Sequence, residues 1–261
     1  MVNPGEALSL LFLFGLALLA LVWLSHQVSQ RVQWVVFFMT RDVRLATLVL
    51  FLLLLPGIFI HEAAHWATAR LLGLKAGKFR VWPKMQGKTI GLGSVSVQRG
   101  VLWQDSLVGI APLLVGTAFI AVIANHIFAA DRISALIAQG RWSDGLTGFW
   151  SALGNADGAL WAYLLFAIAN AMMPSSSDRE PLKPLLLYLA AIVSVYLILG
   201  FPVGPFAEAL AWLTPTLELV TGALLFTALL DLLILAVLWS VELLVAPPRR
   251  VVQARGRGRR G

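Results

Sequence analysis

Cysteine is absent from this chain, and charged residues make up only 13% of its 261 positions. The absence of cysteine excludes disulfide bonds, thiolate metal ligands and a cysteine nucleophile, so any bound metal must be held by His, Asp or Glu. Hydrophobic residues make up 59% of the chain, and the mean hydropathy is +0.83. This composition excludes a soluble globular fold and indicates a protein that crosses a membrane several times.

Apolar runs close to the ~20 residues that cross a bilayer as a helix predict about six transmembrane helices. We expect these helices at about 6–25, 45–70, 103–128, 158–174, 184–201 and 215–245. The first run follows a segment without basic residues or a cleavage site, so it is expected to stay in the protein. Trp34–Met39 is too short to span, and we expect it at the interface or at the start of the second helix. The expected fold class is an all-α polytopic membrane protein.

The placement of Lys and Arg predicts the orientation in the membrane. With a cytoplasmic amino terminus, the segments inside the cell hold fourteen Lys and Arg residues, and the segments outside hold five. We therefore expect both termini in the cytoplasm, in a prokaryotic inner membrane. The carboxy-terminal end of the second helix is then expected at the cytoplasmic face.

The chain is expected to comprise four regions. They are 1–44 with the first helix and an outer loop, 45–185 with a three-helix core, 186–246 with additional helices, and a basic tail at 247–261. The tail is rich in Arg and Gly, which is typical of nucleic-acid arms, but a basic tail beside a membrane helix also contacts anionic lipid headgroups. We favour the second interpretation and expect the lipid bilayer, not nucleic acid, as its partner.

A small β-hairpin or sheet is expected at 75–100, between the second and third helices. Ile90–Leu92 and Val95–Val97 alternate apolar and small residues in opposite phases, as two short strands offset by a bulge at Gly91–Ser94 would. At the cytoplasmic face, such an element is either a connector or an exposed edge that holds an unwound peptide extended.

Residues 61–65 read HEAAH inside the second apolar run. Because residues four apart share one face of a helix, His61 and His65 can present their imidazoles to one metal ion, with Glu62 beside a metal-bound water. The alternative is that the three side chains only satisfy one another between packed helices. Charged groups at membrane depth are costly and usually mark function, so the pattern favours a zinc hydrolase whose third ligand lies elsewhere.

The fourth apolar run offers a candidate for that third ligand. It ends in FAIANAMMPSSSDREP, where Asn170 lies among apolar residues, Pro174 ends the helix, and Asp178 follows at the depth expected for the two histidines. Considered alone, Asp178 is better explained as an ordinary capping carboxylate. Asp231, near the centre of the last run, is expected to hydrogen-bond between helices or to line a polar path, too deep to reach the metal.

These segments resemble the site-2 protease family of intramembrane zinc metalloproteases. The family's second motif, NxxPxxxxD, carries a metal-binding Asp eight residues after an Asn, and Asn170 and Asp178 reproduce that spacing. The segment SLVGIAPLLVG at 106–116 is similar to the family's SxxGP segment. Pro174 falls four residues after the Asn instead of three, and Arg179 stands where the family commonly has Gly, so the chain resembles a divergent member.

The resemblance covers about 45–185 and implies a three-helix catalytic core. It implies zinc as the cofactor, held by His61, His65 and Asp178. It further implies that Glu62 is the general base and that Asn170 orients the substrate. The implied reaction is hydrolysis of a peptide bond in or next to a transmembrane segment of a membrane-protein substrate.

Two other functions fit the HEAAH motif. A prenyl-protein-type membrane zinc protease takes a Glu as its third ligand, and the downstream candidates are Glu208, Glu218 and Glu242. A zinc-binding membrane scaffold or transporter would hold the metal without hydrolysis.

Overall fold

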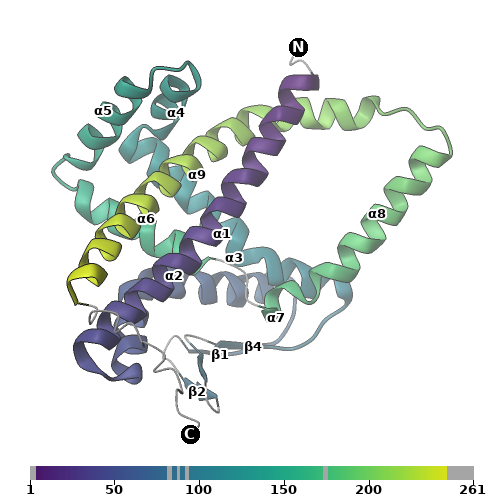
Figure 1. Ribbon diagram of the computed structural model, residues 1–261. Helices are drawn as coiled ribbons and strands as arrows, with labels where there is room; N and C mark the ends of the chain where they lie inside the picture. Colours follow the sequence, from purple (N-terminus) through teal and green to yellow (C-terminus); the bar gives the residue numbers. More distant parts are fainter. Residues whose placement is uncertain (1–3, 81–83, 87–88, 92–93, 173–175, 246–261) are drawn as a thin grey trace, which may run out of the picture.

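Helices dominate the computed structural model, which describes residues 4–80, 84–86, 89–91, 94–172 and 176–245. The helices are α1 (Pro4–Thr40), α2 (Val43–Leu71), α3 (Leu102–Phe128), α4 (Ala130–Ala138), α5 (Trp142–Leu153), α6 (Gly158–Ala171), α7 (Ser176–Arg179), α8 (Leu182–Ile198) and α9 (Gly204–Val245) (Figure 1). Among the described residues, α1, α2, α3 and α9 are long and apolar enough to cross a membrane. The predicted all-α polytopic membrane fold is confirmed.

The first helix is longer than the sequence predicted. It continues through the polar stretch after Leu24 to Thr40, so Trp34–Met39 is its last part, and not an interfacial piece or the start of the second helix. The reason is that Val28 and Val32 keep the four-residue spacing of the apolar face and are buried in the core. Only a short turn then leads to α2, which begins where Asp42 Oδ1 accepts hydrogen bonds from the N–H groups of Arg44 and Leu45.

Strands join α2 to α3, as expected for 75–100. β1 (Ala76–Arg80) pairs antiparallel with β4 (Ser94–Val97), and β2 (Lys84–Gln86) pairs antiparallel with β3 (Thr89–Gly91). An irregularity in register lies between Ala76 and Phe79 of β1. The bulge predicted at Gly91–Ser94 falls partly outside the described residues.

The segment between α3 and α6, which lies between two predicted membrane helices, forms the short helices α4 and α5. α5 and α6 are separated by a bend of 103°. They count as a fifth membrane-spanning unit only if this bent pair is taken as one span, because α6 alone has 14 residues.

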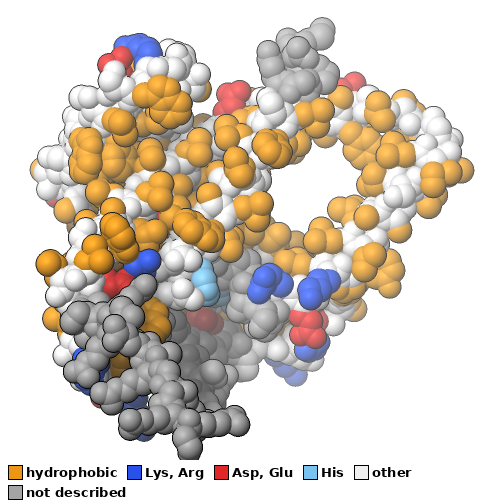
Figure 2. Space-filling view, in the orientation of Figure 1, with side chains coloured by type: hydrophobic (Ala, Val, Ile, Leu, Met, Phe, Trp, Pro, Cys, Tyr) orange, Lys and Arg blue, Asp and Glu red, His pale blue; other side chains and the backbone are white. Residues whose placement is uncertain are grey.

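The carboxy-terminal helices differ in how they pack. α8 has 17 residues and no buried residue, and it projects from the body together with the start of α9 (Figure 1). Figure 2 shows hydrophobic side chains along this projection and an opening between it and the rest of the molecule. α9 begins at Gly204, earlier than predicted, because the helix continues through Pro215.

The core lies where α1, α2, α3, α6 and α9 meet. Its fully buried side chains include Phe51, Ile120, Leu165 and Leu224, and the rings of Phe128 and Phe226 stack at 5.0 Å. α1 and α9 run side by side in the same direction, and Arg31 of α1 forms an ion pair with Glu242 of α9. Their described ends, Pro4 and Val245, therefore lie at opposite ends of the bundle (Figure 1).

Candidate metal centre

The two histidines of the HEAAH motif lie one turn apart on α2, on the same face. The Nε2 atoms of His61 and His65 are 3.2 Å apart, and the ring centroids are 4.9 Å apart at an interplanar angle of 78°. The four-residue spacing of an α-helix thus produces the paired imidazoles that the sequence predicted.

Asp178 of α7 completes a group of three. Its Oδ1 lies 3.3 Å from His65 Nε2, and its Oδ2 lies 3.7 Å from His61 Nε2. One ligand atom from each residue falls within 4.8 Å of the others, so the group could hold a metal ion. The three side chains are about one-eighth exposed, at 12%, which leaves a way for water to reach them.

Small residues of α3 position Asp178. A Cβ atom placed on Gly109 would lie 2.5 Å from the carbonyl oxygen of Asp178, so only glycine permits this approach. Ser106 Oγ lies 2.8 Å from the carbonyl oxygen of Pro181, just after α7, and 2.8 Å from that of Leu102, and its single proton is shared between them. The SxxG segment of α3 therefore contacts the chain at Asp178 and just after it, a role that its spacing alone did not reveal.

The tautomer of His65 is fixed by the backbone of α3. Its Nδ1–H donates a hydrogen bond of 2.8 Å to the carbonyl oxygen of Val108, which leaves the lone pair of Nε2 toward Asp178 and His61. Metal-ligating histidines commonly make this bond from the ring nitrogen that does not bind the metal. Within the described part of the chain, His61 Nδ1 is buried without a hydrogen-bond partner.

Close packing of α2 against α6 places His61 deep in the bundle. A Cβ atom on Gly57, one turn before His61, would lie 2.0 Å from the carbonyl oxygen of Ala167. The two backbones approach so closely only because this residue is glycine. Glu62 is buried, with 9% of its surface exposed, and it is close enough to His65 to interact with it electrostatically.

Asn170 and Asp231 form a second polar group. Asn170 Nδ2 donates to Asp231 Oδ1 at 3.0 Å and Oδ2 at 3.3 Å, and to the carbonyl oxygen of Phe166 at 2.9 Å. Ser25 Oγ of α1 donates to the carbonyl oxygen of Asn170 at 3.1 Å, a contact that the sequence analysis missed. The expected interhelical hydrogen bond of Asp231 is therefore present, and Asp231 does not belong to the metal group.

The downstream glutamates considered as ligands lie elsewhere in the described structure. Glu242 pairs with Arg31, and Glu208 and Glu218 are exposed residues of α9. None of the three belongs to the group that could hold a metal.

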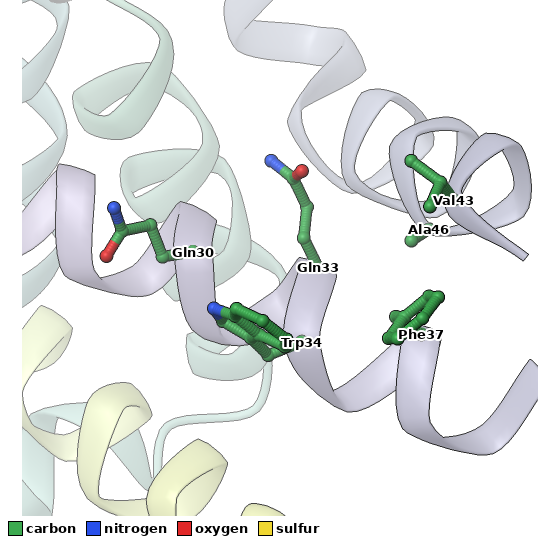
Figure 3. A pocket seen from close by; sticks show the side chains of 6 residues that line it. All are labelled: Gln30, Gln33, Trp34, Phe37, Val43 and Ala46. Carbon is green, nitrogen blue, oxygen red and sulfur yellow. The ribbon is translucent and has the colours of Figure 1, made fainter. Parts of the chain in front are cut away.

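A pocket of about 350 Å³ lies at the turn between α1 and α2. Figure 3 shows that α1 contributes most of its lining and α2 the rest; the lining residues are Gln30, Gln33, Trp34, Phe37, Val43 and Ala46. His61 follows Ala46 by 15 residues along α2, a helical distance of about 22 Å. The pocket is therefore separate from the metal group.

No protein-family model, no curated protein and no solved structure matches this chain. The resemblance to the site-2 proteases thus rests on the motif residues themselves. Because two of those motifs, HEAAH and the Asn170–Asp178 segment, supply the three side chains that converge, any functional conclusion has to be built on this site.

Proposed function

We propose that this protein is an intramembrane zinc metalloprotease that hydrolyses a peptide bond in or next to a transmembrane segment of a membrane-protein substrate. One observation carries the proposal: His61 and His65 of α2 and Asp178 of α7 converge in a chain with several membrane-spanning helices. Asp178 follows His65 by 113 positions in the sequence, so the fold, and not local spacing, brings its carboxylate to the two histidines.

The donor set fits zinc. Two imidazole nitrogens and one carboxylate oxygen are typical ligands of a catalytic zinc site, which keeps its fourth position open for water. Zinc in such a site polarises a carbonyl group and makes a water molecule more acidic.

The protein's own side chains supply the remaining functions. Glu62, buried beside the ligands, accepts the proton from the attacking water and later delivers it to the leaving amine. The carbonyl oxygen of Val108 keeps His65 in the tautomer that can bind metal. Asn170 orients the substrate through its Oδ1, since its amino group is held by Asp231.

The strands offer a place to hold an unwound substrate. Phe79 of β1 packs edge-on against Phe59 of α2, with ring centroids 5.4 Å apart, and Phe59 precedes His61 by two residues. A peptide bond must leave its helix before it can be cleaved, and the edge of a strand that packs on α2, the helix with the two histidines, can hold it extended by β-augmentation.

We further infer that the membrane is a prokaryotic inner membrane and that the basic tail is cytoplasmic, as the positive-inside rule predicts. The parallel packing of α1 and α9 affects the predicted side of the amino terminus. If both helices cross the membrane fully, the amino terminus lies on the opposite side from the tail, against the expectation that both ends are cytoplasmic. Reporters fused to each terminus test this point.

The direct test uses purified protein in vesicles with a model single-span membrane protein whose transmembrane segment carries helix-breaking residues. We expect cleavage that a zinc chelator abolishes and added Zn²⁺ restores, and that Glu62→Gln lacks. Cleavage that ignores the chelator and persists in Glu62→Gln would exclude the proposal. Zinc binding without cleavage of any such substrate would favour the scaffold or transporter.

A further inference from the structure

The helical hairpin of α4 and α5 has an inner face closed by small residues. A Cβ atom on Gly145 would lie 2.6 Å from Ile137 Cγ1, so glycine lets α5 pack directly on α4. Phe149, on the same side of α5, is buried and its ring lies 5.0 Å from that of Phe226 of α9. The hairpin is thus firmly attached to the body of the molecule.

Two exposed stripes run along the rest of α5. Trp142, Leu146 and Trp150, each four residues apart, are exposed by 63%, 48% and 57%. The neighbouring stripe is exposed too and is entirely polar; it consists of Ser143, Thr147 and Ser151. Two tryptophans and a leucine in one line are an unusual surface to leave in water, whereas tryptophan is enriched where a membrane meets water.

The direction of α5 rules out a simple crossing of the bilayer. It is bent by 103° from α6, whose residues Leu165–Asn170 are buried among the other helices of the bundle. If α6 runs across the membrane, α5 runs nearly along its plane. With 12 residues, α5 is about 18 Å long, much shorter than the ~30 Å hydrocarbon core.

The charges of the hairpin do not supply an attraction to anionic lipid. Arg141 and Asp144 pair with each other at 2.7 Å, and the remaining charged residues from 129 to 157 are Asp131, Arg132 and Asp157. The segment therefore carries two positive and three negative side chains. Its binding to a membrane must then depend on the aromatic stripe and not on attraction to anionic lipid.

We propose that α5 is an interfacial anchor that lies in the membrane surface of the leaflet away from the β-strands. The Trp142, Leu146 and Trp150 stripe occupies the boundary between lipid headgroups and acyl chains, and the Ser143, Thr147 and Ser151 stripe faces water. Figures 1 and 2 show the hairpin at the end of the molecule remote from the strands, with hydrophobic side chains gathered over it. The anchor fixes the depth of α3 and α6, between which it is inserted.

Because the chain has no cysteine, single labels can be placed on α5 without background. Leu146→Cys and Thr147→Cys differ by one position and lie on the two stripes, so each is the matched control of the other. Each variant is labelled with an environment-sensitive fluorophore and reconstituted in phosphatidylcholine vesicles. Its quenching is measured with lipids carrying a nitroxide near the headgroup, with lipids carrying one deep in the acyl chain, and with aqueous iodide.

We expect the label at 146 to be quenched several-fold more by the shallow nitroxide than the label at 147, and the label at 147 to be quenched mainly by iodide. Adding phosphatidylglycerol should leave these ratios unchanged. Equal iodide quenching at both positions would place the stripe in water and overturn the proposal. Strongest quenching of 146 by the deep nitroxide would make α5 part of a span, and protection of 146 from all three quenchers would assign the stripe to a second protein chain; either result also overturns it.

Discussion

Two polar groups of the helical bundle are built differently. In the metal group, two imidazole nitrogens and a carboxylate point at one spot, and their side chains keep 12% exposure. In the second group, the amide of Asn170 donates to both oxygens of Asp231, which is fully buried. A donor paired with an acceptor is satisfied without an ion, whereas converging ligand atoms gain most when a cation joins them. The first group is therefore suited to binding a metal ion, whereas the second links helices and leaves only Asn170 Oδ1 without a hydrogen-bond partner in the described structure.

Removing a histidine from the metal group should have the largest effect. We expect the wild-type protein to carry about one zinc per chain, and His61→Ala and His65→Ala, which leave two ligands each, to carry almost none. The measurement is zinc per chain by elemental analysis of purified protein. His26→Ala is the matched control, because His26 contacts Gln30 on α1 and lies outside the metal group. Full zinc content in both motif variants would remove the basis of the comparison.

Glu62→Gln tests chemistry without changing the ligands. The substitution keeps the size of the side chain but removes its ability to accept a proton, so cleavage of the model substrate should fall by about 10²- to 10⁴-fold. Zinc per chain should stay at the wild-type value. Normal turnover in this variant would show that Glu62 is not the base.

The HEAAH pair could be predicted from sequence because its geometry is local: residues four apart on a helix must share a face. The approach of Asp178 could not be derived in this way: its expected depth made it a candidate, and the resemblance to a known family favoured it over a capping role. The length of α1 was missed because its polar residues after Leu24 were taken as a break, although Val28 and Val32 continue the buried face. The hydrogen bond from Ser25 to Asn170 spans 145 positions, and no local pattern encodes such a contact.

Asp178 and Asp231 provide the sharpest contrast between the two groups. Asp178→Ala should lose zinc and cleavage together. Asp231→Asn should keep the zinc and lower the free energy of unfolding by about 1 kcal/mol, the size of an interhelical hydrogen bond in a membrane protein. Zinc per chain and thermal unfolding in the same detergent distinguish the two. If Asp231→Asn loses zinc and Asp178→Ala keeps it, the assignments must be exchanged.

A smaller effect is expected from the contact that holds Asp178. In Gly109→Ala, the new Cβ would approach the Asp178 carbonyl oxygen to 2.5 Å, so α7 must shift away from the histidines. Zinc affinity should fall by about tenfold, as for other residues that support metal ligands. Gly15→Ala is the control, because a Cβ at that helical glycine meets no atom within 4 Å. Equal zinc affinity in the two variants would show that α7 does not depend on this approach.

The hydroxyl of Ser25 replaces a hydrogen-bond donor that a proline cannot supply. In a continuing helix, the carbonyl oxygen of Asn170 would accept from the N–H of the residue four positions later, but that residue is Pro174, which has no N–H. Inside a bilayer no water replaces the missing donor, and an unsatisfied carbonyl costs several kcal/mol. The hydroxyl of Ser25 supplies the donor from another helix. α6 can therefore end at Ala171 inside the bundle, because α1, which contributes no metal ligand, satisfies the carbonyl group that proline leaves without a donor.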